Sequence, residues 1–399
     1  MEPRLNPLNY KVTTRSLVWV HTRILVSVLL ALLIGLSMIP PALSQETSKA
    51  PDWASSVLNP FWTGSRMSGE TLLFVQGEDS GPATAQLLFV PEKIITVTSA
   101  NGATVFEKDR DYVWKPGSNI LTLTPHSRIP FKTEAQLHPP KGAPMALGDS
   151  INGLTSLFFD GDGSVLQTLQ VAVTYDHQGK WSGYVPRPAG KQLPRTLAKL
   201  KAGQALKLVV FGDSISVGAG ASGTFHAPPY QPAYVGLVVE GLRARFGAEI
   251  ALKNPSEGGQ DTTWAVTTAP KIADEDPDLV ILAFGMNDVG RAIPTATYAQ
   301  NIQKVIDIIR QRRPDAEFIL LSPMTGNSDW TLMHPALFRE YREALSRMVG
   351  PGVGLADVTS VWQDIVKTKK FLDLTGNGLN HPNDFGYRVY AQVILQSLQ

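Results

Sequence analysis

From residue 206 onward, short apolar runs alternate with longer helical stretches, and this alternation constrains the fold more than any other feature of the sequence. The runs are nearly continuous in apolar residues, as is typical of parallel strands that are buried on both faces. In such a sheet, ligands bind beyond the carboxyl ends of the strands. The predicted strands are 208–211, 249–253, 278–284, 317–322 and 354–358, and the predicted helices are 233–246, 298–312, 335–348 and 384–398.

The preceding region, from about residue 52 to residue 188, has a different pattern. Short β-rich runs are separated there by clusters of Gly, Pro, Asp and Asn, which favour turns. The predicted strands are 71–75, 85–90, 93–97 and 165–173. Many short strands without helical periodicity favour a β-sandwich of jelly-roll type. The sequence therefore predicts a β-sandwich accessory domain over 45–195, followed by an α/β domain over 196–399.

The first 44 residues have the composition of a targeting segment. Arg4, Lys11, Arg15 and Arg23 precede an apolar run at 24–39, and residues 42–44 form a small-residue cleavage site. The run is shorter than the ~20 residues that span a bilayer. This favours a cleaved signal peptide over 1–44, and an uncleaved N-terminal membrane anchor is the alternative. Both predict an exported protein, periplasmic or extracellular.

Composition excludes several kinds of chemistry. The chain contains no cysteine, so disulfides, thiolate nucleophiles and cysteine metal sites are excluded. The histidines of the α/β region, His226, His334 and His381, lack metal-ligand spacing. The formal net charge is only +1, which gives no basic surface for nucleic acid. We expect no cofactor, no metal and no nucleic-acid partner.

Four short blocks in the α/β region carry residue types that suit acyl transfer. A serine after a strand, Ser214, can attack a carbonyl if a base such as His381 takes its proton. The backbone N–H of Gly259 and the side-chain amide of Asn287 can donate to an oxyanion. The blocks lie at 212–216, 254–260, 285–288 and 380–384, the first three after predicted strands and the last before the final helix.

In order and spacing, these blocks resemble the SGNH (GDSL-like) hydrolase superfamily over about residues 206–399. The resemblance implies a three-layer α/β/α, flavodoxin-like domain that needs no cofactor. It implies that Ser214 is the nucleophile and also an oxyanion-hole amide. It further implies Gly259 as the second amide donor, Asn287 as the side-chain donor and His381 as the base.

One position departs from the family pattern. The family usually has an aspartate three residues before the histidine, and that position is Gly378 here. Two alternatives are open. A backbone carbonyl orients the imidazole of a Ser–His dyad, which is the interpretation we favour, or a one-residue insertion lets Asn377 or a more distant aspartate take the place. Asp373 and Asp384 lie nearby in the sequence.

The predicted function is that of an exported serine esterase acting on O-acyl, in particular O-acetyl, esters of carbohydrates, either small molecules or polysaccharides. Trp264 and Trp330 follow predicted strands, and they either stack on a sugar ring or pack in the core. The alternatives are a lipase or thioesterase of the same superfamily, and a non-catalytic carbohydrate-binding or surface-assembly module on this scaffold. The serine and histidine favour catalysis, whereas the missing aspartate favours the module.

Overall fold

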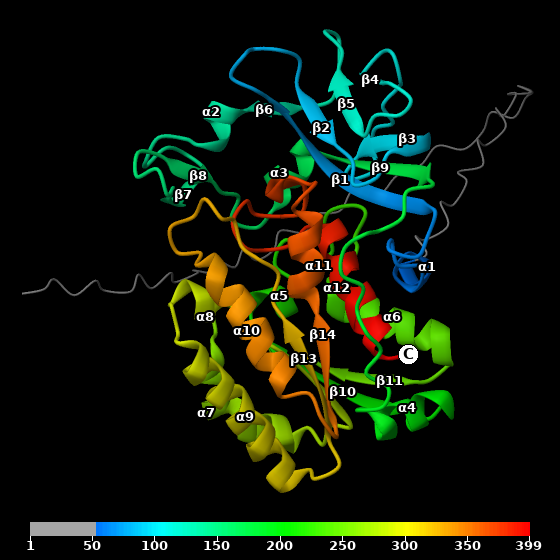
Figure 1. Ribbon diagram of the computed structural model, residues 1–399, viewed down its shortest axis with the longest axis vertical. Coiled ribbons are helices and arrows are strands. Elements are labelled where there is room, and N and C mark those ends of the chain that lie inside the picture. Colours follow the sequence, from blue (N-terminus) through cyan, green and yellow to red (C-terminus); the bar gives the residue numbers. More distant parts are fainter. Residues whose placement is uncertain (1–52) are drawn as a thin grey trace, which may run out of the picture. The chain divides into compact units, whose positions relative to one another are not determined.

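The computed structural model describes residues 53–399 (Figure 1). The predicted signal segment, 1–44, lies outside the described residues, so its cleavage and the export of the chain stay predictions. Within 53–399, no helix combines the length and the apolar character needed to cross a membrane.

The second half of the chain contains a five-stranded parallel sheet in the order β11-β10-β12-β13-β14. This order is that of a doubly wound, flavodoxin-like sheet. The predicted parallel α/β architecture is therefore confirmed. The strands are β10 (Leu206–Gly212), β11 (Ile250–Lys253), β12 (Leu279–Ala283), β13 (Glu317–Ser322) and β14 (Val353–Asp357).

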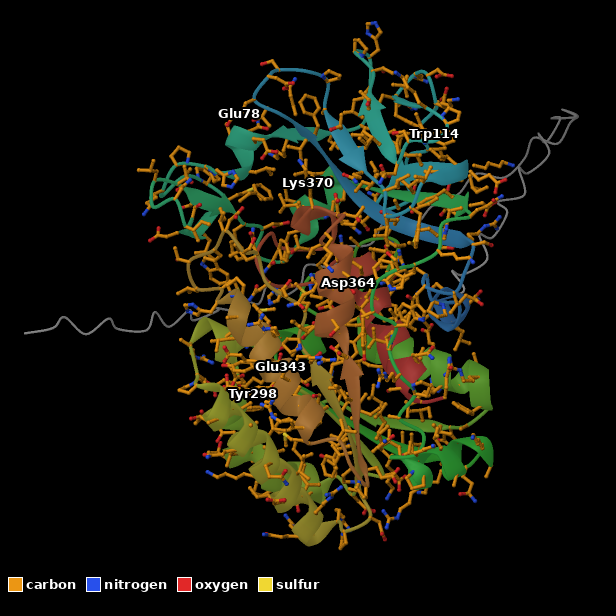
Figure 2. The ribbon with its side chains drawn as sticks, viewed as in Figure 1. Glu78, Trp114, Tyr298, Glu343, Asp364 and Lys370 are labelled. Atoms are coloured by element: carbon orange, nitrogen blue, oxygen red, sulfur yellow. The ribbon has the colours of Figure 1, made fainter. Side chains whose placement is uncertain are left out.

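Helices cover this sheet, with α4, α6 and α12 in one group and α7, α9 and α10 in another (Figure 1). Between α9 and α10, the rings of Tyr298 and Tyr341 stack with their centroids 4.0 Å apart; Figure 2 labels Tyr298. The helices of this region are α4 (Pro194–Lys201), α5 (Ser214–Val217), α6 (Tyr234–Phe246), α7 (Thr262–Asp274), α8 (Met286–Gly290), α9 (Thr295–Arg312), α10 (Pro335–Arg347), α11 (Val358–Ile365), the 3₁₀ helix η1 (Phe371–Asp373) and α12 (Asp384–Ser397).

Helix α7 was not among the predicted helices. Pro270 lies inside it, and a proline normally indicates that a helix has ended. The helix nevertheless begins at a strong N-cap, because the Asp261 carboxylate accepts hydrogen bonds from the backbone N–H groups of Thr263 and Trp264, at 2.9 and 3.2 Å.

The first half of the described chain does not confirm a jelly-roll sandwich. Its main strands form one curled, mostly antiparallel sheet in the order β3-β9-β1-β2-β5-β4, with β6 parallel to β1. Strand β1 contains a bulge between Met67 and Glu70, and it pairs first with β9 and then with β2 and β6. A bulge of this kind bends a strand and increases its twist, so one long strand serves both parts of the sheet.

The elements of this region are α1 (Trp53–Leu58), β1 (Arg66–Gln76), β2 (Thr84–Gln86), β3 (Pro91–Ser99), β4 (Tyr112–Trp114), β5 (Ile120–Leu123), β6 (Phe131–Thr133), α2 (Glu134–Leu137), β7 (Ala146–Asp149), β8 (Ser156–Phe158), α3 (Ser164–Leu169) and β9 (Gln170–His177). Strands β7 and β8 form a separate hairpin.

The predicted strand at 165–173 is wrong in its first half, which is helix α3. Two aspartates fold the chain into this helix. Asp162 Oδ1 accepts the N–H of Ser164 at 2.9 Å, and Asp160 Oδ2 accepts the N–H of Leu166 at 2.6 Å. These bonds satisfy N–H groups that a helix leaves free in its first turn. The predicted strand at 85–90 is also shorter, since β2 ends at Gln86.

A buried ionic cluster joins the two regions. The Lys369 ammonium lies 2.6 Å from Glu70 Oε1, in β1, and 3.4 Å from Asp373 Oδ2, in η1; the Lys369 and Glu70 side chains have no exposed surface and that of Asp373 almost none. The Asp373 carboxylate also accepts the N–H of Leu73 at 2.7 Å. Burial raises the pKa of Asp373, and the ammonium of Lys369 opposes this rise. Because both regions contribute to this cluster, the division into domains 45–195 and 196–399 stays a prediction.

We predict that Lys369→Met lowers the free energy of unfolding by about 3–5 kcal/mol, because it leaves buried carboxylates without their cation. The control is Lys370→Met. Lys370, labelled in Figure 2, is half exposed and lies 3.3 Å from the exposed Glu134, so its loss should cost less than about 1 kcal/mol. Urea denaturation of both variants measures the difference. Equal losses would contradict the assignment of the cluster as a main connection.

Candidate active site

Ser214 lies just beyond the carboxyl end of β10 and is the first residue of the short helix α5. Asp213 caps this helix, because its Oδ1 accepts the N–H of Ile215 at 2.9 Å. Gly212 is required by close packing: a Cβ there would lie 2.6 Å from the carbonyl oxygen of Ala283 in β12. The chain therefore turns sharply between sheet and helix, and Ser214 stands at the edge where ligands bind in such sheets.

His381 comes from the loop between η1 and α12, and its Nε2 lies 2.9 Å from Ser214 Oγ. Although the residue keeps some exposure, protein atoms surround its ring, and this burial lowers the pKa of His381 to about 4. The imidazole is therefore neutral at neutral pH. A neutral imidazole in contact with a serine hydroxyl is the pairing that a serine nucleophile needs.

The side chain of Asn377 occupies the other side of the imidazole. Its Nδ2 lies 3.0 Å from His381 Nδ1 and donates to Asn380 Oδ1, also at 3.0 Å. Its Oδ1 accepts the backbone N–H groups of Leu379, Asn380 and His381, at 3.0, 3.0 and 3.1 Å. Asn377 thus organises the loop and contacts the ring at the same time.

This geometry bears on the two alternatives for the missing aspartate. The group next to His381 Nδ1 is the side-chain amide of Asn377. The interpretation we favoured had a backbone carbonyl at this position, and the alternative had Asn377. Asp373 instead faces Lys369, and Asp384 accepts the N–H of Ser222 at 2.9 Å. In the sequence, Asn377 lies four residues before His381, which is the family's usual three-residue spacing plus a one-residue insertion.

Gly378 cannot carry the aspartate that the family pattern places there. Its φ is +87°, a conformation that other residues rarely adopt, and a Cβ would overlap the carbonyl oxygen of Phe158 in β8. The carbonyl of Gly378 in turn accepts Asn327 Nδ2 at 3.0 Å. The β7–β8 hairpin therefore fixes the loop so closely that only glycine fits at this position.

The structure also brings the loop with Gly259 to Ser214. The N–H of Glu257 donates to Gly212 O at 3.2 Å, and a Cβ on Gly258 would lie 3.8 Å from Ser214 Cβ. Gly259 has a φ of +78°, and its carbonyl accepts Arg291 Nη2 at 2.8 Å. Arg291, which sequence analysis did not single out, also contacts Asp261 Oδ2 at 2.9 Å and so ties the loop to the start of α7.

Asn287 lies in α8, after β12, and its amide is near the same site. Its Nδ2 donates to Gln260 O at 2.9 Å and lies 3.5 Å from Asp213 Oδ2. Burial raises the pKa of Asp213 to about 7 and that of Asp288 to about 6. Two carboxyl groups with pKa values close to neutral therefore lie near Asn287. Asp213 is next to its side-chain amide, and Asp288 follows it in the chain.

Trp264 and Trp330, for which the sequence left sugar stacking and core packing open, both pack against protein groups. The Trp264 ring contacts Phe211 and Phe284, with centroid distances of 5.4 and 6.3 Å, and packs against the core. Trp330 is half buried and lies against the β7–β8 hairpin, since a Cβ on Gly148 would come within 2.6 Å of its Cδ1. Both tryptophans are partly buried.

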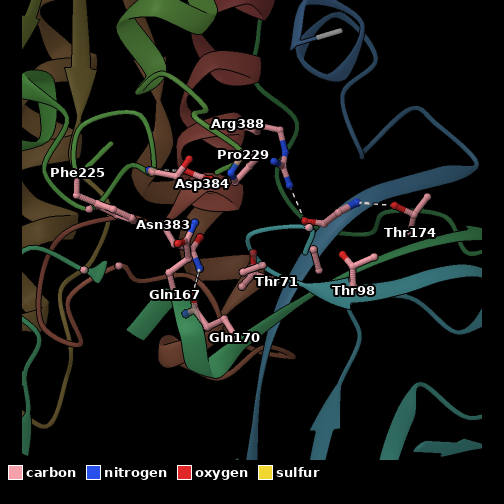
Figure 3. A pocket seen from close by; sticks show the side chains of 18 of the residues that line it. Thr71, Thr98, Gln167, Gln170, Thr174, Phe225, Pro229, Asn383, Asp384 and Arg388 are labelled. Carbon is pink, nitrogen blue, oxygen red and sulfur yellow. Dashed lines mark hydrogen bonds between the residues drawn. The ribbon is translucent and has the colours of Figure 1, made fainter. Parts of the chain in front are cut away.

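A cavity of about 220 Å³ lies next to the loop that contains His381, since Gly376 and Asn383 line it (Figure 3). Its wall includes Gly220 and Gly376, and a Cβ on Gly220 would lie 3.4 Å from His381 Cβ. Arg388 also lines it and donates to the carbonyl oxygens of Ser68 and Gly69, the latter at 2.5 Å. The cavity is thus part of the interface between β1 and α12. Across residues 53–399, no three acidic or histidine side chains are grouped so that they could hold a metal ion.

Comparison with known proteins relates this region of the chain to a family. Residues 210–389 match the model of the GDSL-like Lipase/Acylhydrolase family. An arylesterase of Vibrio mimicus is 30% identical over 105 residues, which are 26% of this chain and 48% of the arylesterase. The chain thus spans about half the length of this curated relative.

Two solved structures of esterases resemble the chain at low identity. A two-domain esterase (CEX) active on acetylated mannans has a TM-score of 0.43 and 20% identity, covering 54% of each chain. Axe2, an acetylxylan esterase from Geobacillus stearothermophilus, has a TM-score of 0.40 and 19% identity, covering 50% of this chain and 96% of its own.

The matched region includes Ser214, Gly259, Asn287 and His381. The chain carries a GDSL-like lipase/acylhydrolase (SGNH) domain, as the sequence motifs predicted.

The lowered pKa of His381 predicts a pH-dependent stability. In the unfolded chain, His381 binds a proton below about pH 6.5, whereas in the folded protein it binds one only near pH 4. Lowering the pH from 6.5 to 4 therefore favours the unfolded state. Between about pH 7 and pH 4, the wild type should lose about 3 kcal/mol more unfolding free energy than His381→Gln, which has no such group. Denaturant titrations across this range test it, and parallel curves for the two proteins would contradict it.

Proposed function

We propose that this protein is a serine esterase that hydrolyses carboxylic esters by acyl transfer. The observation that carries the proposal is the 2.9 Å contact between Ser214 Oγ and His381 Nε2 at the carboxyl edge of a parallel sheet. The GDSL-like domain and the arylesterase relative support the same class of reaction.

In the proposed reaction, Ser214 Oγ attacks the ester carbonyl carbon while its proton passes to His381 Nε2. The tetrahedral intermediate then collapses, the acyl–oxygen bond to the alcohol breaks, and the imidazolium returns the proton to the departing alcohol. Water, deprotonated by His381, attacks the acyl-enzyme next. The acid is released, and Ser214 regains its proton.

The negative oxygen of each intermediate needs hydrogen-bond donors. The N–H of Ser214 is in the first turn of α5, where a helix has no intrahelical acceptor for it. We assign Ser214 N–H, Gly259 N–H and the Asn287 amide as these donors. The Gly258 backbone adjoins Ser214, which supports this assignment. The bonds from Arg291 to Gly259 O and from Asn287 to Gln260 O hold the donors before substrate binds, and such preorganisation is a large source of catalysis.

We further propose O-acyl esters of carbohydrates, in particular O-acetyl esters, as substrates. Two observations support this choice. Trp330 lies against the β7–β8 hairpin, the same hairpin that contacts the His381 loop, and its partly buried indole is of the kind that stacks on sugars. The basic and apolar pattern of the first 44 residues favours export, which would place the enzyme where polysaccharides occur.

The test is hydrolysis of p-nitrophenyl acetate by the wild type, Ser214→Ala and His381→Ala. We expect each variant to lose at least about 10³-fold in kcat, because nucleophile and base act as one unit. Ser346→Ala is the matched control. Ser346 lies in α10, bonds to Glu343 O within its own helix, and should leave the rate unchanged.

If the wild type is no faster than Ser214→Ala, both on this ester and on acetylated polysaccharides, the esterase proposal fails. A binding module on the same scaffold would then explain the fold. If long-chain or thioester substrates alone are hydrolysed, the lipase or thioesterase alternative replaces the carbohydrate substrate.

A further inference from the structure

The hydrogen bonds around Asn377 determine where the proton of neutral His381 lies. Asn377 Nδ2 is a donor, and it lies 3.0 Å from His381 Nδ1. A donor next to Nδ1 requires a lone pair on that nitrogen. A neutral imidazole carries one proton, which is then on Nε2, 2.9 Å from Ser214 Oγ. In this tautomer the ring donates to the serine, and it can accept the serine proton only after its own proton has moved to Nδ1.

The orientation of the Asn377 amide is set by its other contacts. Its Oδ1 accepts three backbone N–H groups, from Leu379, Asn380 and His381. Turning the amide over would point its NH₂ group at these donors and lose the three bonds. It would also lose the bond from Nδ2 to Asn380 Oδ1. The loop therefore keeps the amide nitrogen beside the imidazole.

We infer that Asn377 is a positioning residue that holds neutral His381 in the tautomer protonated on Nε2, so that the wild-type site turns over more slowly than the same site with an aspartate at this position. This inference rests on the proposed esterase function. An asparagine in place of the aspartate in a serine protease leaves the geometry intact and lowers kcat by about 10⁴-fold through the same change of tautomer.

Position 377 has the geometry to accept an aspartate. In Asn377→Asp, one carboxylate oxygen would accept the three backbone N–H groups and the other would accept Nδ1–H of His381. The proton of the neutral ring then lies on Nδ1, and the lone pair of Nε2 faces the Ser214 hydroxyl. Asn380 can turn its own amide to donate to the new carboxylate. By contrast, Gly378 cannot be replaced in this way, because a Cβ there overlaps Phe158 O.

The experiment records ¹⁵N chemical shifts of the His381 imidazole near neutral pH, together with kcat on p-nitrophenyl acetate, for the wild type and Asn377→Asp. We expect the wild-type ring to be protonated on Nε2 and the variant ring on Nδ1. We expect kcat to rise by about 10²- to 10⁴-fold in the variant. Ser214→Ala in the variant background should remove the gain. Asn380→Asp is the matched control, since it adds the same charge but keeps the Asn377 amide at Nδ1, and its ring should stay protonated on Nε2.

A wild-type ring protonated on Nδ1 would overturn the inference, as would a folded Asn377→Asp with no gain in kcat over an active wild type. Failure of the proposed function looks different. In that case neither protein hydrolyses esters faster than its Ser214→Ala counterpart. The predicted rise in kcat then fails together with the esterase proposal, while the ¹⁵N shifts still show which ring nitrogen carries the proton.

Discussion

The buried ammonium of Lys369 is the contact on which the geometry of the site depends. It lies between Glu70 in β1 and Asp373 in η1, and it also donates to the carbonyl oxygens of Thr71 and Gln86. A buried cation is tolerated only when such partners surround it, so the cluster forces the N-terminal sheet and the segment before His381 into one arrangement. The histidine that follows this segment contacts Ser214, which belongs to another part of the chain.

The N-terminal region therefore does more than cover one side of the α/β sheet. The carbonyl of Phe158 in β8 packs against Gly378, and Arg388 in α12 donates to the carbonyl of Gly69 in β1. The first contact fixes the segment that contains Asn377 and His381, and the second connects α12, which follows that segment, to β1. Packing between regions far apart in the sequence therefore excludes an aspartate at position 378, whereas hydrogen bonds within the loop orient Asn377.

Much of this arrangement could be predicted from the sequence, because it depends on local patterns. The apolar strands and the motif at 212–216 identify the parallel sheet and Ser214. Features that depend on individual side-chain hydrogen bonds could not be predicted in the same way. The sequence around 165–173 resembles a strand, yet Asp160 and Asp162 begin a helix there, and Pro270 obscures α7. The role of Asn377 depends on which of its amide atoms meets the ring, which only the surrounding hydrogen bonds determine.

The central claim is that Ser214 is a nucleophile activated by His381. Its most direct test is covalent: the protein is incubated with p-nitrophenyl dimethylcarbamate, and the site of the slowly hydrolysed carbamoyl group is mapped by mass spectrometry of peptides. We expect one carbamoyl group on Ser214, formed with release of one equivalent of p-nitrophenol and much more slowly in His381→Ala. Modification at another residue, or equal rates with and without the histidine, would contradict it.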